Sequence, residues 1–212
     1  MEKRMFKVYA KNDEKIQLKV IPGHFVTSQS HITHYMDMTT MKTRCAEAGR
    51  IAAVLAQRYE ATPVDSIICL DGLEVVGAFL AEELAQAGVL SMNAHKTIYI
   101  VTPEFHQNGQ ILFRDNIQHM IRNRNVVILM GSITTGVTLH QCMESVLYYG
   151  GKIQGVSAIF SAVNKVAGIE INAVFHKQDI PNYESYHAQD CPMCKKQEKI
   201  DAIVNGYGYS KL

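Results

Sequence analysis

Residues 126–139 read VVILMGSITTGVTL, and this stretch decides the fold. The five apolar residues from Val126 to Met130 predict a buried strand. A loop rich in Gly, Ser and Thr follows at 131–138, and apolar residues at helical spacing then predict a helix over 139–147. The backbone N–H groups and hydroxyls of such a loop favour a phosphate group, and so does the positive end of the helix dipole. An ordinary strand-to-helix turn capped by Ser and Thr is the alternative.

The same alternation of strands and helices runs through the middle of the chain. Apolar runs predict further strands, and helical spacing predicts further helices, with Gly88 ending the second one. Continuous apolar strands that alternate with helices are typical of a parallel sheet covered on both faces. We therefore expect an α/β fold, a parallel sheet flanked by helices. The additional strands are expected at 66–70, 97–102, 156–163 and 169–175, and the additional helices at 48–59, 73–84 and 114–124.

The two ends of the chain differ from this middle part. Strand-like pieces lie within 5–20, whereas 21–40 is polar with aromatic residues and predicts irregular structure or short strands. Residues 103–110 contain Pro, Asn and Gly and predict an exposed loop. We expect three parts, namely an N-terminal hood at 1–40, an α/β core at 41–180 and a C-terminal tail at 181–212.

The composition indicates a soluble globular protein. The formal net charge of +1 over 212 residues shows no basic excess of the kind that binds nucleic acid. No apolar run is long enough to predict a membrane span, and the charged N-terminus lacks the core of a signal peptide. The five cysteines are odd in number and mostly lie in apolar patterns. They favour a reducing cytoplasm, so we expect a cytoplasmic protein with neither nucleic-acid nor membrane partners.

Three strand ends carry the polar residues that we expect to form one cleft. They are Asp71-Gly72, Thr102-Pro103 and the loop at 131–138. Ligands of parallel α/β sheets bind at the carboxyl ends of the strands, where these segments meet. Asp71 and Glu74 are candidates for binding residues there, although both also suit the cap and first turn of a helix.

The Ser132-Ile133-Thr134-Thr135-Gly136-Val137-Thr138 loop resembles the signature of the type I phosphoribosyltransferases, and within them of the orotate phosphoribosyltransferases. The order of elements is similar over most of the chain. Residues 31–37, HITHYMD, resemble the hood segment that closes over the base in this family. Asp71-Gly72-Leu73-Glu74 lies where the family places its pyrophosphate loop, and a Cys-Pro-x-Cys near the C-terminus occurs in some members.

Two departures from the family pattern concern charge. The family has two acidic residues that grip the ribose of phosphoribosyl pyrophosphate, and this chain has Met130 and Gly131 there. Each lost charge-assisted hydrogen bond removes about 1.5–3 kcal/mol. Orotate enzymes also carry an Arg-Lys pair at the strand end that reads Thr102-Pro103 in this chain, and a further Lys soon after it. This chain offers only His106 and Arg114 as nearby cations. Asp71 and Glu74 are candidates to replace the missing acidic groups.

The resemblance implies transfer of ribose 5-phosphate from phosphoribosyl pyrophosphate to a nucleobase, orotate being the first candidate, with release of pyrophosphate. It implies Mg²⁺ bound with the donor, and a homodimer. A non-catalytic regulator that binds a nucleotide or sugar phosphate is the alternative, and a relative with another donor or base is a third. The implied phosphate-binding residues are Ser132, Thr134, Thr135, Gly136 and Thr138; the pyrophosphate loop is Asp71, Gly72 and Glu74; the hood residues near the base are His34 and Tyr35; and the catalytic candidates are Asp71, Glu74, His106 and Arg114.

For the histidines, Tyr35 and three of the cysteines, a role without chemistry is the alternative. His31, His34 and His106 are expected at the surface, and Tyr35 is expected either to pack or to stack on a base. Apolar patterns place three cysteines in the core, namely Cys45, Cys69 and Cys142.

The Cys191-Pro192-Met193-Cys194 motif raises the question of zinc, with His187 as a third ligand. A tetrahedral zinc site needs four ligands, and the sequence shows neither a fourth nor a second Cys-x-x-Cys. A structural or incidental pair is therefore favoured over a metal site.

Overall fold

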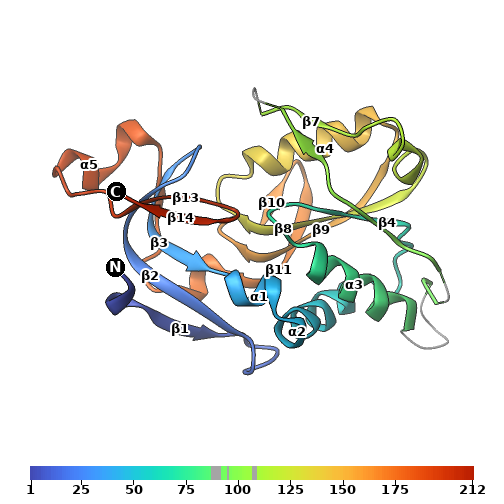
Figure 1. Cartoon of the computed structure of the whole chain (residues 1–212), viewed down its shortest axis with the longest axis horizontal. Coiled ribbons are helices and arrows are strands. Elements are labelled where there is room, and N and C mark those ends of the chain that lie inside the picture. The colour runs from blue at the N-terminus through green and yellow to red at the C-terminus, as the bar shows by residue number, and fades with distance from the viewer. Residues whose placement is uncertain (87–91, 95, 107–108) are drawn as a thin grey trace.

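The computed structural model describes residues 1–86, 92–94, 96–106 and 109–212, and Figure 1 shows two sheets joined by helices. The helix end predicted at Gly88 lies outside these residues. Among the described residues, no helix is both long and apolar enough to cross a bilayer. The helices are α1 (Thr39–Thr43), α2 (Cys45–Ala56), α3 (Glu74–Gln86), α4 (Val137–Tyr148) and α5 (Pro192–Lys195), with short 3₁₀ turns at Glu2–Arg4, Gln57–Tyr59, Gln118–Met120, Lys177–Asp179 and Ala188–Asp190.

The core sheet confirms the predicted α/β class. Its strand order is β10-β11-β9-β8-β4-β5, and all neighbours run parallel except β10 with β11. Numbered along the chain, the five parallel strands follow the doubly wound order 2-1-3-4-5, whose switch point lies between β4 and β8. Their bounds are β4 (Ser66–Cys69), β5 (Tyr99–Val101), β8 (Asn125–Ile133), β9 (Lys152–Ser161), β10 (Lys165–Val166) and β11 (Ile169–His176).

Both faces of this sheet are buried, which explains the continuous apolar run from Val126 to Met130 in its central strand β8. Val127 and Leu129 of β8 belong to the cluster beneath α2 and α3, whereas Val126, Ile128 and Met130 pack beneath α4. Successive side chains of a strand point to opposite faces, so a sheet covered on both sides needs a continuous apolar run.

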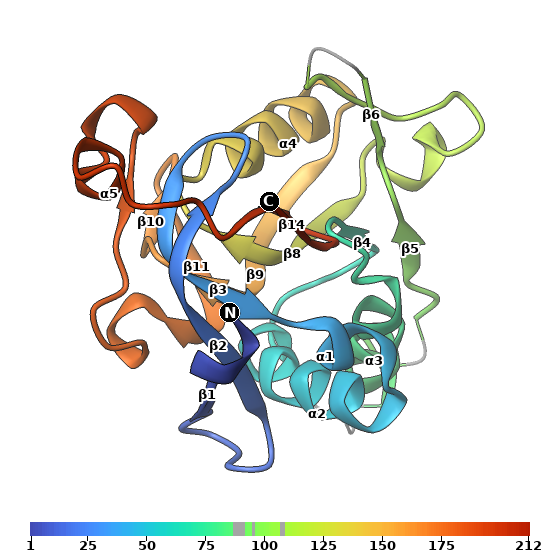
Figure 2. The ribbon, with the colours of Figure 1, turned by 60° about the vertical axis from the view of Figure 1, so that its left-hand side comes forward.

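A second sheet forms the hood, and both ends of the chain build it (Figure 2). Its order is β12-β3-β2-β13-β14, with β1 also paired to β2. The C-terminal residues therefore lie in the same sheet as the N-terminal strands, and β13 runs parallel to β2. Side chains of this sheet, including Phe25 and Met36, join the cluster beneath α2 and α3. The bounds are β1 (Phe6–Tyr9), β2 (Gln17–Val26), β3 (His31–Asp37), β12 (Ser185–Tyr186), β13 (Ala202–Asn205) and β14 (Gly208–Lys211).

Several expectations about local structure are wrong. Residues 21–37, expected as irregular structure or short strands, belong instead to two paired strands of ten and seven residues, because each finds a partner in the hood sheet. The helix expected at 114–124 is reduced to the 3₁₀ turn Gln118–Met120. The expected loop at 103–110 contains β6 (Glu104–Phe105), which pairs with β7 (Ile111–Leu112). Strand β8 continues through Gly131 and Ser132, because β9 supplies pairing partners as far as Ile133.

Candidate functional site

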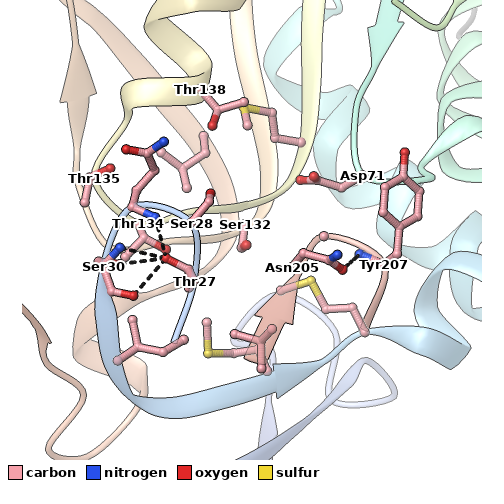
Figure 3. Close-up of a pocket in the computed structure, with 18 of the residues that line it drawn as sticks. Thr27, Ser28, Ser30, Asp71, Ser132, Thr134, Thr135, Thr138, Asn205 and Tyr207 are labelled. Carbon is pink, nitrogen blue, oxygen red and sulfur yellow. Dashed lines mark hydrogen bonds between the residues drawn. The ribbon is translucent and has the colours of Figure 1, made fainter. Parts of the chain in front are cut away.

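A cavity of ≈ 540 Å³ lies at the switch point of the core sheet, beneath the hood (Figure 3). The ends of β4 and β8 supply one wall, and two turns of the hood supply the other. The third strand end, Thr102-Pro103, does not line it, so two of the three predicted strand ends converge. The lining residues from the strand ends include Asp71, Gly72, Met130, Ser132, Thr134, Thr135, Gly136 and Thr138; those from the hood include Thr27, Ser28, Gln29, Ser30, Tyr35, Asn205, Gly206 and Tyr207.

The tight turn between β8 and α4 brings the predicted phosphate loop into this cavity. Gly136 is the N-cap of α4 and has φ +83°, a left-handed conformation that favours glycine. A Cβ at this position would lie 2.7 Å from Cγ2 of Val166, so Gly136 also allows a close approach to β10. The first N–H groups of a helix have no partner within it. The N-terminus of α4 therefore presents donors and positive dipole to the cavity.

Asp71 lies at the end of β4, directly beside β8. Its φ of +59° is left-handed, a conformation that Asp tolerates better than most residues. Its Oδ2 accepts a hydrogen bond from the backbone N–H of Gly131 at 3.0 Å. A Cβ on Gly131 would lie 3.2 Å from that same Oδ2. The carboxylate of Asp71 thus occupies the space beside position 131, where the family carries an acidic side chain.

Lys42 of α1 lines the cavity and connects α1 with the turn at Asp71 and with the turn after β13. Its ammonium donates to the carbonyl oxygen of Asp71 at 2.7 Å and to that of Gly206 in the turn after β13. Burial lowers the pKa of Lys42, and the charges of Asp71 and Glu74 act in the opposite direction. Among the described lining residues, Lys42 is the one basic side chain and Asp71 the one acidic side chain.

Two hood turns complete the cavity, and sequence reasoning missed both of them. Thr27 and Ser30 close the β2–β3 turn, where Oγ1 of Thr27 accepts from the N–H of Ser30 at 2.8 Å. Asn205 closes the β13–β14 turn, and its Oδ1 accepts from the N–H of Tyr207 at 2.9 Å. The Asn205-Gly206 pair is a sequence signal for a hairpin turn, but only the fold shows that the turn faces Asp71.

Four of the predicted site residues do not line the cavity. Glu74 accepts a hydrogen bond from Oγ1 of Thr102 at 3.0 Å. Arg114 forms a two-point ion pair with Glu104 at 2.6 and 2.7 Å, and this pairing lowers the pKa of Glu104. The remaining two are His106, which is exposed, and His34.

His34 and Tyr35 point to opposite faces of β3, as neighbours in a strand do. His34 is buried between the rings of Phe6 and Tyr183, and this burial lowers its pKa. Tyr35 lines the cavity and packs on Phe25. Burial, followed by the charges of Asp37 and Tyr209, raises the pKa of Tyr35 to about 12.

The structure corrects three expectations about histidines and cysteines. His31 and His34 are buried rather than at the surface, because β3 lies between β2 and β12. Cys45 is exposed at the first turn of α2, whereas Cys69 and Cys142 are buried as predicted.

The predicted grouping of His187 with Cys191 and Cys194 is not found in the structure. His187 is exposed and outside the group that the two cysteines form. The cysteines lie instead beside His24 and His31 of the hood.

Comparison with solved structures places this architecture among the type I phosphoribosyltransferases. Orotate phosphoribosyltransferase from Aeropyrum pernix superimposes with a TM-score of 0.53 at 17% identity, over 75% of this chain and 88% of that one. The phosphoribosyltransferase from Corynebacterium diphtheriae gives 0.52 at 15% identity, over 76% and 89%. UMP synthase from Leishmania donovani gives 0.54 at 16% identity, over 75% of this chain and 34% of that chain. The chain therefore has the type I phosphoribosyltransferase fold.

The curated sequence relatives are orotate phosphoribosyltransferases. The protein from Desulforamulus reducens is 24% identical over 179 residues, which cover 82% of this chain and 84% of the relative. That from Pelotomaculum thermopropionicum is 24% identical over 191 residues, covering 88% and 90%. No family model matches the chain. The chain is thus similar in sequence to orotate phosphoribosyltransferases, and it carries Met130 and Gly131 where the resemblance leads us to expect two acidic residues.

Proposed function

We propose that this protein is a phosphoribosyltransferase that transfers ribose 5-phosphate from phosphoribosyl pyrophosphate to a nucleobase, with orotate as the first candidate. The observation that carries the proposal is the placement of the Thr134-Thr135-Gly136 turn, at the N-terminus of α4, beside Asp71 in one cavity at the switch point. The cavity has the size of a small-molecule site. The homodimer and the cytoplasmic location stay predictions.

In this proposal different residues bind different parts of phosphoribosyl pyrophosphate. The loop of Ser132, Thr134, Thr135, Gly136 and Thr138 binds the 5-phosphate through backbone N–H groups and hydroxyls. Asp71 takes the place of the missing acidic pair at the ribose and pyrophosphate. Transfer at the anomeric carbon passes through a state with positive charge on the sugar, which a fixed carboxylate stabilises.

Mg²⁺ is proposed to bind together with the pyrophosphate. The metal neutralises part of the negative charge of pyrophosphate and so makes it a better leaving group. This hard cation takes oxygen ligands. Asp71 supplies a carboxylate at the cavity wall, and pyrophosphate and water would supply the other ligands.

The proposed base subsite lies under the hood. Tyr35 faces the cavity from β3, and Tyr207 lies in the β13–β14 turn. A Cβ on Gly72 would be 3.6 Å from the ring of Tyr207, so this ring lies close over the pyrophosphate loop. Aromatic faces of this kind can stack on a planar base.

A non-catalytic nucleotide or sugar-phosphate sensor is the second candidate. The observation that favours it is the scarcity of positive charge in the cavity. Lys42 is committed to two backbone carbonyls, and Arg114 to Glu104, so neither is free to neutralise a leaving pyrophosphate. Both candidate functions need the phosphate loop, but only the transferase would convert the bound donor to product.

Calorimetry with phosphoribosyl pyrophosphate and Mg²⁺, followed by a pyrophosphate-release assay over a panel of bases, separates the candidates. Binding with release supports the transferase, and binding without release on any base supports the sensor. Thr135→Ala should weaken donor binding about tenfold, because a hydrogen bond to a charged group contributes about 1.5–3 kcal/mol. Thr62→Ala, outside the cavity lining, is the matched control and should bind as the wild type does. Unchanged affinity in Thr135→Ala contradicts the loop assignment.

A further inference from the structure

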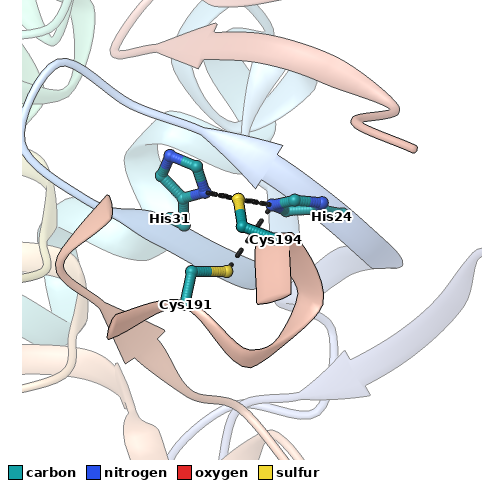
Figure 4. Close-up of side chains that lie close together, drawn as sticks. All are labelled: His24, His31, Cys191 and Cys194. Atoms are coloured by element: carbon teal, nitrogen blue, oxygen red, sulfur yellow. Dashed lines mark hydrogen bonds between the residues drawn. The ribbon is translucent and has the colours of Figure 1, made fainter. Parts of the chain in front are cut away.

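Four side chains that can bind metal meet between the β2–β3 hairpin of the hood and the segment around α5 (Figure 4). His24 comes from β2, and His31 begins β3. Cys191 is the N-cap of the short α5, and Cys194 lies within this helix. The two pairs are separated by more than 150 residues of sequence, and the fold alone brings them together. One ligand atom from each residue lies within 4.8 Å of the others.

The spacing of these atoms fits a tetrahedral zinc site. Zn–N bonds of about 2.0–2.1 Å and Zn–S bonds of about 2.3 Å require edges of about 3.4 Å between two nitrogens and about 3.6 Å between nitrogen and sulfur. Nε2 of His24 lies 3.6 Å from Sγ of Cys191 and 3.6 Å from Sγ of Cys194. Nδ1 of His31 lies 3.3 Å from Sγ of Cys194 and 3.0 Å from Nε2 of His24.

A hydrogen bond outside the group prepares His24 to act as a ligand. The ring atom Nδ1 of His24 lies 3.1 Å from the carbonyl oxygen of Glu198. A carbonyl can only accept, so Nδ1 carries the hydrogen, and Nε2 of the neutral ring has a lone pair that faces the sulfurs. Metal-binding histidines commonly donate their other N–H in this way, which fixes the orientation of the ring.

We propose that His24, His31, Cys191 and Cys194 bind one structural Zn²⁺. Four protein ligands fill a tetrahedral shell, which distinguishes a structural site from a catalytic one with an open position. Both cysteines bind as thiolates and release their protons to solvent. The buried setting of His24, His31 and Cys191 suits a closed site.

The location gives the metal a role at the cavity. His24 and His31 flank the β2–β3 turn, whose residues Thr27 and Ser30 line the cavity. A metal bound by both histidines and by the C-terminal cysteines would hold the base of this turn against the segment around α5. The turn then keeps its position over the phosphate loop before any ligand binds.

Zinc titration of metal-free protein under reducing conditions tests the proposal, and the readout does not depend on transferase activity. We expect one Zn²⁺ per chain by elemental analysis. Co²⁺ should give the visible bands of a tetrahedral ion together with a thiolate-to-cobalt charge-transfer band, which reports the ligands directly in folded wild-type protein.

Variants separate this group from other thiols and histidines. Cys191→Ser and Cys194→Ser should each weaken zinc affinity by more than about 100-fold, since loss of a direct ligand exceeds the 10–100-fold cost of losing an outer partner. Cys45→Ser and His187→Gln are the controls, because both residues lie outside the group and should bind zinc as the wild type does. Wild-type protein that binds zinc no more tightly than Cys191→Ser overturns the proposal. A Cys191–Cys194 disulfide in native, zinc-free protein also overturns it.

Discussion

Asp71 combines three roles at a single position. Its left-handed backbone ends β4, its carbonyl oxygen accepts from Lys42, and its carboxylate accepts the N–H of Gly131. The strained backbone is held by contacts on both sides, a situation that is common at functional sites. The side chain is thus placed before a ligand arrives, which favours binding because little order remains to be imposed.

Replacing Asp71 tests whether its charge matters. Asp71→Asn tolerates the left-handed backbone and keeps an oxygen for the N–H of Gly131, so mainly the negative charge is lost. We expect at least tenfold weaker binding of phosphoribosyl pyrophosphate with Mg²⁺ by calorimetry, and a change in unfolding free energy below about 1 kcal/mol. Glu74→Gln is the control because Glu74 lies outside the cavity lining. Unchanged affinity in Asp71→Asn would exclude the proposed replacement of the acidic pair.

Gly136 offers a second test at the residue scale. Gly136→Ala combines a positive φ with a Cβ only 2.7 Å from Val166, whereas Gly168→Ala has φ +82° and nothing within 4 Å. Backbone strain should lower the free energy of unfolding in urea by about 1 kcal/mol in both variants. Gly136→Ala should show a further loss from the close contact with Val166, and it should bind inorganic phosphate more weakly. Equal losses in the two variants, with phosphate affinity intact, would mean that the close approach at Gly136 is unimportant.

At the scale of elements, the core sheet was predictable, whereas only the part of the hood within residues 5–20 was expected as strands, and it forms β1 and the start of β2. The strands β4, β8, β9 and β11 are recognisable because burial on both faces favours runs of apolar residues. The hood strands β2 and β3 carry His24, His31 and His34, whose polarity suggested irregular structure or short strands. These histidines are buried because both N- and C-terminal segments cover them, and short-range sequence patterns do not reveal such pairing.

The candidate site also has a part that the sequence predicts and a part that only the fold reveals. The predicted phosphate loop is continuous in sequence, and its five residues do line one cavity. Phosphate binding by this loop stays a prediction. Lys42, the Thr27–Ser30 turn and the Asn205–Tyr207 turn reach that cavity from distant parts of the chain. Their positions depend on how the hood sheet packs over the core, which no local spacing encodes.

Lys42→Met tests the connection between α1, the Asp71 turn and the β13–β14 turn. Methionine fills similar space but leaves the carbonyls of Asp71 and Gly206 without their donor. Each unsatisfied partly buried group costs about 1–3 kcal/mol, and two carbonyls lose their donor, so we expect the free energy of unfolding in urea to fall by at least about 2 kcal/mol. Lys165→Met, whose side chain is 60% exposed, should change stability by less than about 0.5 kcal/mol. Equal stability of both variants would show that Lys42 does not join these segments.

At the scale of the whole molecule, buried tyrosines predict loss of stability at alkaline pH. Burial raises the pKa of Tyr59 from 10.0 to about 12, and the same cause raises those of Tyr35 and Tyr183 to about 12. Between pH 10 and 12 the unfolded chain releases these protons while the folded chain retains them. The folded state therefore loses up to about 1.4 kcal/mol per pH unit for each tyrosine, and the loss is absent below pH 10.

Tyr59→Phe should make this alkaline loss shallower, as measured by urea unfolding at pH 9, 10 and 11. At pH 7 the variant should lose only about 1 kcal/mol, because Ser157 keeps its hydrogen bond from Asn172. Tyr148→Phe replaces an exposed ring and serves as the control. An alkaline slope in Tyr59→Phe equal to that of the wild type would contradict the assignment.

The parallel pairing of β13 with β2 also constrains the order in which the protein can fold during synthesis. The N-terminal strands leave the ribosome first, yet their sheet lacks β13 and β14 until residues 202–211 have been translated. Domains generally fold as units while the chain emerges, and long-range pairings form late. The α/β core can thus fold around β4, β8 and β9 before β13 and β14 are added, so the β13–β14 turn joins the wall of the cavity only in the last step of folding.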